Sequence, residues 1–304
     1  MFLGAGGIVI NEAGELLVIQ RDDTRTWTYP GGGLDMGELP TDAVVREVEE
    51  ETGIKVYPVR LVGIFFNPIP ARGDLLVFSF RCIQRGGEIK TSAESLQVGF
   101  TPVNPLGVRM LNFTKERTML GVNHTGGPPV MMRNKVSLRE RLLVFWLFRI
   151  FYPIKNWRRA RAGDPYVPPE QWKAIAATVI RNEAGEVLWA QRADNGRWNL
   201  PVGSVEKGEA PWEGALRELT EETGLIGEIT DCTGVYVRPE GRIAFVFSAV
   251  VRGGSLVKTD ESVGFQWVKS GDENADSFYS SHAEWAADAV VEGRGVTVFK
   301  RQTD

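Results

Sequence analysis

Residues 46–54 read REVEEETGI, and residues 217–225, which begin 171 positions later (217 − 46 = 171), read RELTEETGL. Positions i, i+3 and i+4 of an α-helix share one face, so three glutamates of each stretch project together. These trios are Glu47, Glu50 and Glu51, and Glu218, Glu221 and Glu222. Like charges one turn apart repel by roughly a few tenths of a kcal/mol per pair, so a repeated acidic cluster indicates a use for the charge.

Three carboxylates on one helix face form an oxygen-donor site of the kind that Mg²⁺ or Mn²⁺ prefers. Arg46 and Arg217, which open the two stretches, can hydrogen-bond a neighbouring carboxylate and fix its rotamer. Glu49 has Thr220 as its counterpart, so we expect Glu49 to face solvent. A solvated acidic helix face is the alternative for a single cluster, and the second copy of the pattern favours the metal site.

The repetition extends well beyond the acidic stretches. The same offset of 171 aligns NEAGELLVIQR at 11–21 with NEAGEVLWAQR at 182–192, and about half of the positions from 11 to 54 are identical to their partners. A repeat of this length indicates a duplicated domain rather than a short-period solenoid. We therefore expect one domain over 1–125, a linker over 126–170 and a second domain over 171–304.

Each copy has the same order of local signals. A hairpin pattern leads to a glycine-rich loop, at 31–37 or 202–208, whose backbone can approach a metal or a phosphate closely. A helix follows, with Pro40 or Pro211 in its first turn and Gly53 or Gly224 at its C-terminal cap. Further strands are expected near 59–67, 74–83, 229–238 and 242–252. One helix among mostly antiparallel strands, with another helix near the end of each copy, predicts an α+β fold.

The composition excludes several classes of protein. A net charge of −4 and a pI of about 5.5 argue against a broad surface for nucleic acid, so DNA binding is not favoured. The two cysteines are far apart in sequence and no signal peptide is visible, which predicts a cytoplasmic, reducing location. With two histidines in 304 residues, neither a histidine-rich zinc site nor a Ser-His-Asp triad is expected.

The expected linker has a character of its own. SLRE at 137–140 is a capping-box signature, and it opens an apolar helix that we expect to end near Pro153. The basic stretch NWRRARAG follows at 156–163. Burial of the helix between the domains is favoured, because apolar residues cover most of its circumference. The alternative is weak contact with a membrane surface through 138–161.

A longer pattern contains both acidic stretches. G-x5-E-x7-R-E-U-x-E-E-x-G-U, where U is aliphatic, runs from Gly32 to Ile54 and again from Gly203 to Leu225. It resembles the signature box of the Nudix hydrolases, complete in both copies. The resemblance implies two tandem Nudix folds, each an α/β/α sandwich with a mixed sheet, joined by a helical linker. It also implies Mg²⁺- or Mn²⁺-dependent hydrolysis of a nucleoside diphosphate linked to another moiety.

The resemblance assigns roles to residues of this chain. The two glutamate trios would bind metal, with Glu47, Glu50, Glu218 and Glu221 taking part in catalysis. Arg46 and Arg217 would orient those glutamates, while Gly32, Glu38, Gly203 and Glu209 would support the metal site. A glutamate on a later loop often binds metal or acts as base in this family, and Glu94 and Glu261 lie in similar contexts. An ordinary polar loop residue is the alternative for both, and the general base stays unassigned.

The sequence leaves open which substrate is used and whether one or both domains are catalytic. A proline after the box is associated with ADP-ribose-type substrates in the family, and the stretch 67–70 reads NPIP, so ADP-ribose or a nucleotide sugar is favoured. A sanitising (d)NTP pyrophosphohydrolase is the alternative. The first loop contains PGGG and the second PVGS, so one catalytic domain with one non-catalytic nucleotide-binding domain is a further alternative. The sequence leaves the oligomeric state open.

Overall fold

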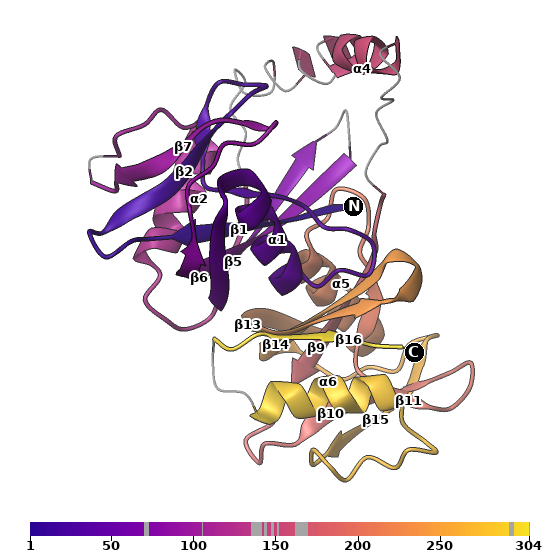
Figure 1. Cartoon of the computed structure of the whole chain (residues 1–304). Coiled ribbons are helices and arrows are strands. Elements are labelled where there is room, and N and C mark those ends of the chain that lie inside the picture. The colour runs from indigo at the N-terminus through magenta and orange to yellow at the C-terminus, as the bar shows by residue number, and fades with distance from the viewer. Residues whose placement is uncertain are drawn as a thin grey trace.

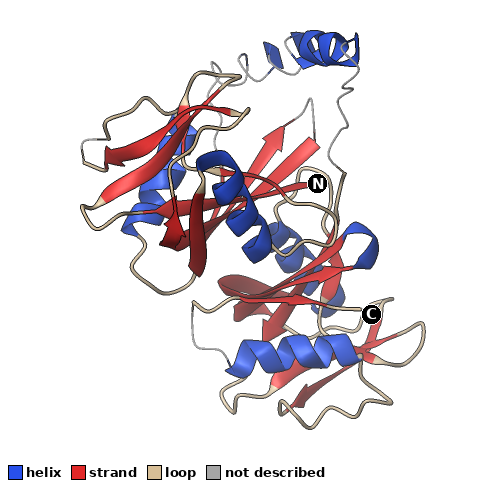
Figure 2. Cartoon of the chain, viewed as in Figure 1, coloured by secondary structure: helices blue, strands red, loops and turns tan. Residues whose placement is uncertain are grey.

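The computed structural model describes residues 1–69, 73–104, 106–134, 142, 145–146, 149–150, 152–161, 170–291 and 295–303. The chain folds into two copies of one arrangement of strands and helices, one after the other along the sequence (Figure 1). In each copy, strands are flanked by helices (Figure 2). The predicted duplication and the predicted α+β class are therefore confirmed.

The first copy contains β1 (Phe2–Val9), β2 (Glu15–Arg21), β3 (Trp27–Thr28), β4 (Gly31–Gly33), α1 (Pro40–Thr52), β5 (Ile54–Ile69), β6 (Gly73–Gly87), β7 (Ser95–Pro102), α2 (Asn112–Asn123) and β8 (Val130–Arg133). The second contains β9 (Lys173–Ile180), β10 (Val187–Arg192), β11 (Trp198–Asn199), β12 (Val202–Ser204), α5 (Pro211–Thr223), β13 (Leu225–Arg238), β14 (Arg242–Gly254), β15 (Ser262–Val268), α6 (Ser280–Val291) and β16 (Val298–Arg301). A short 3₁₀ turn, Pro239–Gly241, joins β13 to β14. Helix α4 (Tyr152–Arg161) lies between the copies in sequence.

Both copies have the same sheet topology. A five-stranded sheet has the order β4-β1-β6-β5-β8 in the first copy and β12-β9-β14-β13-β16 in the second. Strand β1 runs parallel to β6 and antiparallel to β4, so the sheet is mixed, as expected. A three-stranded sheet, β3-β2-β7 or β11-β10-β15, completes each copy.

Two helices cover opposite faces of the first five-stranded sheet. Successive residues of a strand point to opposite faces. A Cβ on Gly7 would lie 2.8 Å from Val48 of α1, whereas a Cβ on Gly121 of α2 would meet the next strand residue, Ile8. The helix that carries the acidic trio is thus packed on one face of the sheet and α2 on the other. This is the α/β/α sandwich that the resemblance implies.

The acidic helices begin and end where the sequence predicts. Helix α1 starts at Pro40, and α5 starts at Pro211. Gly53 and Gly224 follow the two helices with φ of 74° and 76°, the left-handed conformation that glycine adopts without a steric penalty. The helices are therefore anchored at both ends by residue types that the sequence makes visible.

The first copy extends further along the chain than the sequence suggests. Strand β8 falls inside the range expected for the linker, yet it pairs in parallel with β5 of the first copy. Strand β16 pairs with β13 in the same way in the second copy. Neither short strand was expected from the sequence, because four residues carry too little periodicity to be recognised.

One apolar core joins the two copies. Its buried residues include Leu76, Phe78 and Phe80 from β6 and Phe245 and Phe247 from β14. Phe78 stacks on Phe245 with ring centroids 6.0 Å apart and an interplanar angle of 10°. These two residues occupy corresponding strands, so the copies meet through equivalent surfaces, as the subunits of a two-fold symmetric dimer do.

The chain backbone follows the same approximate two-fold relation. The Met1 nitrogen donates to the Trp172 carbonyl oxygen and the Trp172 N–H donates to the Met1 carbonyl oxygen, both at 2.8 Å. Met1 and Trp172 are equivalent under the repeat offset (172 − 1 = 171). A residue that pairs with its own repeat partner marks the position of the local two-fold axis.

The segment between the copies differs from its expected form. SLRE at 137–140 and the start of the expected apolar helix lie outside the described residues. Pro153, the expected helix end, lies in the first turn of α4, where a missing N–H is tolerated. Burial was favoured for this segment, but its described apolar side chains are exposed: Leu142, Phe145, Trp146, Ile150, Ile154 and Trp157. Helix α4 lies apart from both copies in Figure 1.

In the part of the chain that the structure describes, no helix has the length and apolarity needed to cross a membrane.

Candidate active site

The three glutamates of α1 differ sharply in exposure. Glu51 is 5% exposed and accepts a hydrogen bond of 2.7 Å from the Gly31 N–H. The Glu47 side chain is 12% exposed and that of Glu50 is 60% exposed. Glu49 is 48% exposed and pairs with Lys55 at 3.7 Å, so it faces solvent as expected, although Glu50 is more exposed still. The exposure of the three carboxylates therefore increases from Glu51, which is buried, through Glu47 to Glu50, which faces solvent.

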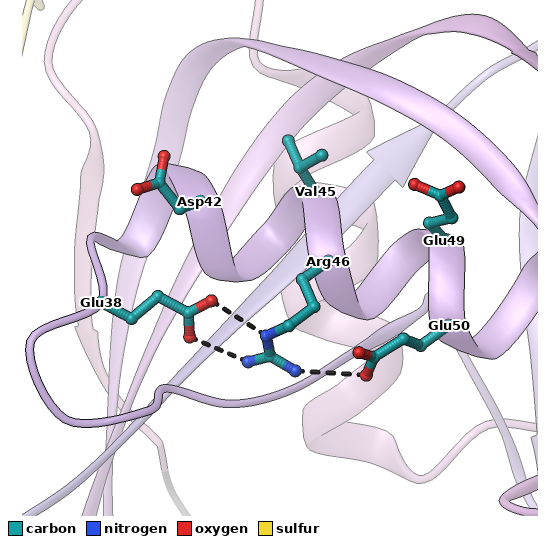
Figure 3. Close-up of a pocket in the computed structure, with 6 residues that line it drawn as sticks. All are labelled: Glu38, Asp42, Val45, Arg46, Glu49 and Glu50. Atoms are coloured by element: carbon teal, nitrogen blue, oxygen red, sulfur yellow. Dashed lines mark hydrogen bonds and ion pairs between the residues drawn. The ribbon is translucent and has the colours of Figure 1, made fainter.

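Arg46 holds this surface together. Its Nε and Nη2 donate to the two carboxylate oxygens of Glu38 at 2.9 and 2.8 Å. Its Nη1 donates to Glu47 at 2.9 Å and to Glu50 at 3.3 Å. Figure 3 shows the guanidinium between Glu38 and Glu50, with Glu49 on another side of the helix. The bidentate pair with Glu38 fixes the orientation of the Arg46 guanidinium. The guanidinium in turn holds the side chains of Glu47 and Glu50 in place.

Arg46 also fixes the loop before the helix, because its Nη2 donates to the Gly33 carbonyl oxygen at 2.9 Å. Its guanidinium pKa is raised, first of all by the hydrogen bond to Glu38. Burial alone would raise the pKa of Glu38, but the hydrogen bonds from Arg46 and the Asp35 N–H outweigh it and lower that pKa. Glu38 therefore stays an anion that anchors Arg46.

The second copy repeats this arrangement contact for contact. Arg217 donates to both oxygens of Glu209 at 3.0 and 3.1 Å, and its Nη1 donates to Glu218 at 2.7 Å and Glu221 at 3.0 Å. Its Nη2 donates to the Ser204 carbonyl oxygen at 2.8 Å. Two independent stretches of the chain thus build one geometry.

A glycine leaves room for the middle carboxylate in each copy. A Cβ on Gly32 would lie 2.3 Å from the Glu47 Oε2, and a Cβ on Gly203 would lie 2.0 Å from the Glu218 carboxyl carbon. Neither glycine has a positive φ, so the requirement is for space and not for backbone freedom. The glycine stands the same number of residues before the glutamate in both copies. The close approach of the glutamate carboxylate to the glycine Cα explains why this position lacks a side chain.

Burial changes the protonation of the site. It raises the pKa of Glu51 and of Glu222 to about 8, and it also raises the pKa of Glu47 and Glu218. The neighbouring carboxylates add to the shift because like charges disfavour ionisation. A divalent cation would reverse this balance, since it stabilises the charged form of each ligand.

A model of the NUDIX domain family matches residues 2–119 and 171–289. The chain belongs to the Nudix family. It has two Nudix domains in tandem, and it is a pyrophosphohydrolase of the Nudix type, a class that acts on nucleoside diphosphate-type small molecules with divalent metal ions.

Each of three known relatives aligns with less than half of this chain. A MutT-like protein of Streptomyces ambofaciens is 41% identical over 108 residues, which is 36% of this chain and 68% of the relative. A putative 8-oxo-dGTP diphosphatase of Bacillus subtilis (strain 168) is 34% identical over 98 residues, which is 32% of this chain and 66% of the relative. Among solved structures, a NUDIX hydrolase from Nitrosomonas europaea aligns with a TM-score of 0.41 at 20% identity, over 46% of this chain and 84% of that one.

The later-loop glutamates of both Nudix domains lie near their boxes. The charge of Glu94 contributes to the raised pKa of Glu47 and Glu51, and that of Glu261 contributes in the same way at Glu218 and Glu222. The loop of the first domain is tied to the box helix, because the Ser95 Oγ donates to the Glu51 carbonyl oxygen at 2.8 Å. The fold thus brings together residues that are more than 40 positions apart in sequence.

The donor set of each Nudix box suits a hard cation. All candidate ligands are carboxylate oxygens, and the Glu222 Oε2 is buried without a hydrogen-bond partner. An orphaned buried oxygen is costly unless a cation or a proton satisfies it. Within the described part of the chain, no three acidic, histidine or cysteine side chains already form a closed coordination cluster. Arg46 and Arg217 explain this, because each holds two of the candidate ligands by hydrogen bonds.

Two other features of the Nudix domains are structural. Phe65, Phe66 and Tyr236, which follow the boxes on β5 and β13, are fully buried, so they pack in the core and are not available to stack on a nucleotide base. Sequence reasoning did not anticipate the backbone N–H of residue 31, which bonds the buried Glu51. Its only sequence signal is the position directly after Pro30, where the glycine-rich loop begins.

Proposed function

We propose that both Nudix boxes are active and that each holds Mg²⁺ or Mn²⁺ for hydrolysis of a diphosphate bond. The observation that carries the proposal is the identical hydrogen-bonded arrangement of arginine and glutamates in the two domains. A solvent-facing glutamate contributes little to stability, so Glu50 and Glu221 are not needed for folding. Their presence in both copies favours two catalytic sites over a catalytic domain with a binding module.

The residues of each site would divide the work. Glu47, Glu50 and Glu51, or their counterparts in the second domain, would bind the cation, which neutralises diphosphate oxygens and lowers the pKa of a bound water. Arg46 and Arg217 would keep two of the glutamates in position. Glu94 and Glu261 are the candidates to accept the proton of the attacking water or to add a ligand. In each domain they stand on a loop next to the trio.

The loop difference between the domains fits this proposal. Gly31 and Val202 occupy the same place before the box; the Gly31 N–H donates to the buried Glu51, and the Val202 backbone lowers the pKa of the buried Glu222 against the larger effect of burial. Residue 202 also keeps its strand pairing, opposite Ala177, as residue 31 does opposite Gly6. The exchange of glycine for valine therefore keeps the strand pairing, although the backbone conformation differs, because Gly31 has a φ of 155° and residue 202 has no positive φ.

For the substrate we propose a nucleoside diphosphate derivative such as ADP-ribose or a nucleotide sugar, on the basis of the prolines that follow the first box. Pro68 is described at the end of β5, whereas Pro70 lies outside the described residues. A sanitising activity on nucleoside triphosphates is the second candidate. It is favoured by the relative from Bacillus subtilis, whose name is putative 8-oxo-dGTP diphosphatase.

A substrate panel tests the proposal directly. The purified chain is incubated with Mg²⁺ or Mn²⁺ and ADP-ribose, NADH, nucleotide sugars, dinucleoside polyphosphates, and normal and oxidised dNTPs, and released nucleotide or phosphate is measured. The control is the Glu50→Gln/Glu221→Gln double variant. We expect metal-dependent cleavage of one class by the unmodified chain and none by the double variant. Turnover that survives in the double variant, or no turnover of any compound, would contradict the proposal.

We also propose that the segment 138–161 contacts an anionic membrane surface through its described, exposed side chains. Its described apolar side chains face solvent, and two of them, Trp146 and Trp157, are of the type that favours the bilayer interface. Arg149 and Arg161 are exposed on the same segment, and the Arg161 guanidinium lies 4.0 Å from the centre of the Trp157 ring. Cationic and aromatic groups together match the chemistry of anionic headgroups.

A further inference from the structure

Two arginines at the ends of the terminal strands cross from one Nudix domain to the other. Arg133, the last residue of β8, donates from Nη2 to the Gly208 carbonyl oxygen at 2.8 Å and from Nε to Glu213 at 3.0 Å. Arg301, the last residue of β16, donates from Nε to the Gly37 carbonyl oxygen at 3.1 Å and from Nη2 to Asp42 at 2.6 Å. Each arginine therefore contacts the loop and the first helical turn of the opposite box.

The two sets of contacts are equivalent under the repeat. Their acceptors are 171 positions apart (208 − 37 = 171 and 213 − 42 = 171). The arginines also correspond, because Arg133 lies opposite Phe66 and Arg301 lies opposite Val237, which are again 171 apart (237 − 66 = 171). A contact made twice, in opposite directions, across one interface is a property of the duplicated architecture and not an accident of one surface.

The contacts reach the acidic trio through a short series of bonds. Gly37 directly precedes Glu38, and the Glu38 carboxylate holds both Nε and Nη2 of Arg46. Arg46 in turn holds Glu47 and Glu50. Gly37 has a φ of 79°, in the left-handed region. Because glycine adopts positive and negative φ about equally well, the backbone at this position has several accessible conformations. Fixing its carbonyl oxygen from outside the domain therefore restricts where Glu38 can stand.

We propose that Arg133 and Arg301 are cross-domain positioning residues, each of which keeps the Nudix box of the other domain in its catalytic geometry. The inference rests on the proposed function, since it assigns a regulatory dependence to those same two sites. It makes the tandem arrangement necessary for activity: each domain supplies a part that the other lacks. Neither arginine touches the glutamate trio, so both act only through the loop and the helix start.

The contacts of Arg133 and those of Arg301 across the domain interface differ in burial. The side chains of Arg133 and Glu213 are 39% and 38% exposed, whereas those of Arg301 and Asp42 are 56% and 50% exposed. Gly208 is held a second time, because its N–H donates to Asp74 of the first domain at 2.6 Å. More exposed ion pairs contribute less, so Arg133 should matter more to the second box than Arg301 does to the first.

The test separates the two sites first and then removes one arginine. Glu221→Gln leaves only the first site active, and Glu50→Gln leaves only the second. In the Glu221→Gln chain, Arg301→Ala should lower kcat of the first site about tenfold, as removal of a residue that orients metal ligands does. In the Glu50→Gln chain, Arg133→Ala should lower kcat of the second site by about tenfold or more.

The crossed combinations give the decisive contrast. Arg301 belongs to the second domain, and Arg301→Ala should leave the rate of the second site unchanged. Arg133 belongs to the first domain, and Arg133→Ala should leave the rate of the first site unchanged. Loss in the domain that carries the arginine, equal loss in both domains, or no loss at all would each overturn the proposal. Arg301→Lys, which keeps the charge, should recover part of the rate lost in Arg301→Ala.

A matched control is available within the second domain. Arg252 pairs with Glu228 at 2.6 Å on an exposed surface away from the interface. Arg252→Ala should change neither site, and melting temperatures of all variants show whether any loss comes from unfolding.

Affinity for Mn²⁺, measured by electron paramagnetic resonance, keeps the inference distinct from the proposed function. A chain that binds Mn²⁺ but cleaves no diphosphate would overturn the function. The effect of each arginine on the site of the other domain would then be measured as Mn²⁺ affinity. In Arg301→Ala/Glu221→Gln, we expect about tenfold weaker Mn²⁺ binding at the first site. Unchanged Mn²⁺ affinity in that double variant, in a chain without turnover, would overturn the positioning role as well.

Discussion

At the residue scale, each acidic site is organised around one arginine. Arg46 and Arg217 each donate to five oxygens on four residues, and they hold carboxylates that would otherwise repel one another. The glutamate trios were identifiable from sequence spacing because a helix places i, i+3 and i+4 on one face. Their unequal burial was not identifiable, since it depends on the loop that folds over Glu51 and Glu222.

The glycine that precedes each box gives a test of the close approach at this scale. Gly32→Ala should displace the Glu47 carboxylate and weaken Mn²⁺ binding at the first site by about tenfold or more. Gly33→Ala is the matched control, because a Cβ there would meet only the Leu3 carbonyl oxygen, at 4.0 Å. Titration with Mn²⁺ in the Glu221→Gln background measures the first site alone. Equal affinities of the two alanine variants would show that the glycine is not needed for space.

His282 gives a pH-dependent prediction. Burial, helped by the charges of Arg238, Arg192 and Arg197, lowers its pKa to about 3, and its Nδ1 accepts the Leu200 N–H at 3.1 Å. The unfolded chain takes up a proton near pH 6.5 while the folded chain does not. The free energy of unfolding therefore falls as the pH drops below about 6.5, by up to about 1.4 kcal/mol per pH unit from this group.

Nuclear magnetic resonance of the ring protons checks this directly. The chain has two histidines, so a His124→Gln variant leaves one to observe. We expect the His282 resonances to stay at their neutral positions from pH 8 down to about pH 4 for as long as the protein is folded. A transition near pH 6.5 in the folded protein would contradict the buried neutral ring.

At the element scale, the sequence predicted the first turn and the C-terminal cap of each box helix, whereas the terminal strands were not predicted at all. Proline at the start and glycine at the end mark α1 and α5, and these are local signals. Strands β8 and β16 are four residues long and are defined by parallel pairing with β5 and β13, which is a long-range effect. The cross-domain arginines stand at the ends of those strands, so they were missed for the same reason.

Lipid vesicles test the proposed membrane contact of the segment 138–161. We expect the chain to co-sediment with vesicles that contain anionic lipid, and to bind less at high salt or on zwitterionic vesicles, because Arg149 and Arg161 attract anionic headgroups. Trp157→Ser should weaken this binding, and Tyr57→Ser, at an exposed aromatic of β5, should not. Equal binding to both vesicle types, or none to either, would contradict the proposed surface.

At the scale of the whole molecule, the two domains share one core and form an internal counterpart of a symmetric dimer. The sequence predicted the duplication through its offset of 171, but it gave no sign of which faces would meet. Inward-facing aromatics such as Phe78 and Phe245 read only as strand residues in the sequence. Their contact is decided by packing between elements that are 167 positions apart (245 − 78 = 167).

A shared core predicts cooperative unfolding. Phe78→Ala should lower the free energy of unfolding by about 3–5 kcal/mol, the usual cost of removing a buried phenylalanine ring. Both domains should lose stability together, so that thermal unfolding, followed by circular dichroism and by the loss of each single-site activity, occurs at one temperature. Separate transitions, with only the first domain shifted, would show that the domains unfold independently.

Both Nudix boxes of this chain are proposed to hydrolyse diphosphates. Turnover of the best substrate, measured in Glu50→Gln, in Glu221→Gln and in the variant with both changes, shows whether both sites work. Each single variant should keep the activity of its intact site, and the double variant should have none. If one single substitution alone abolished all turnover while the protein stayed folded, only one site would be catalytic, which would contradict two active sites.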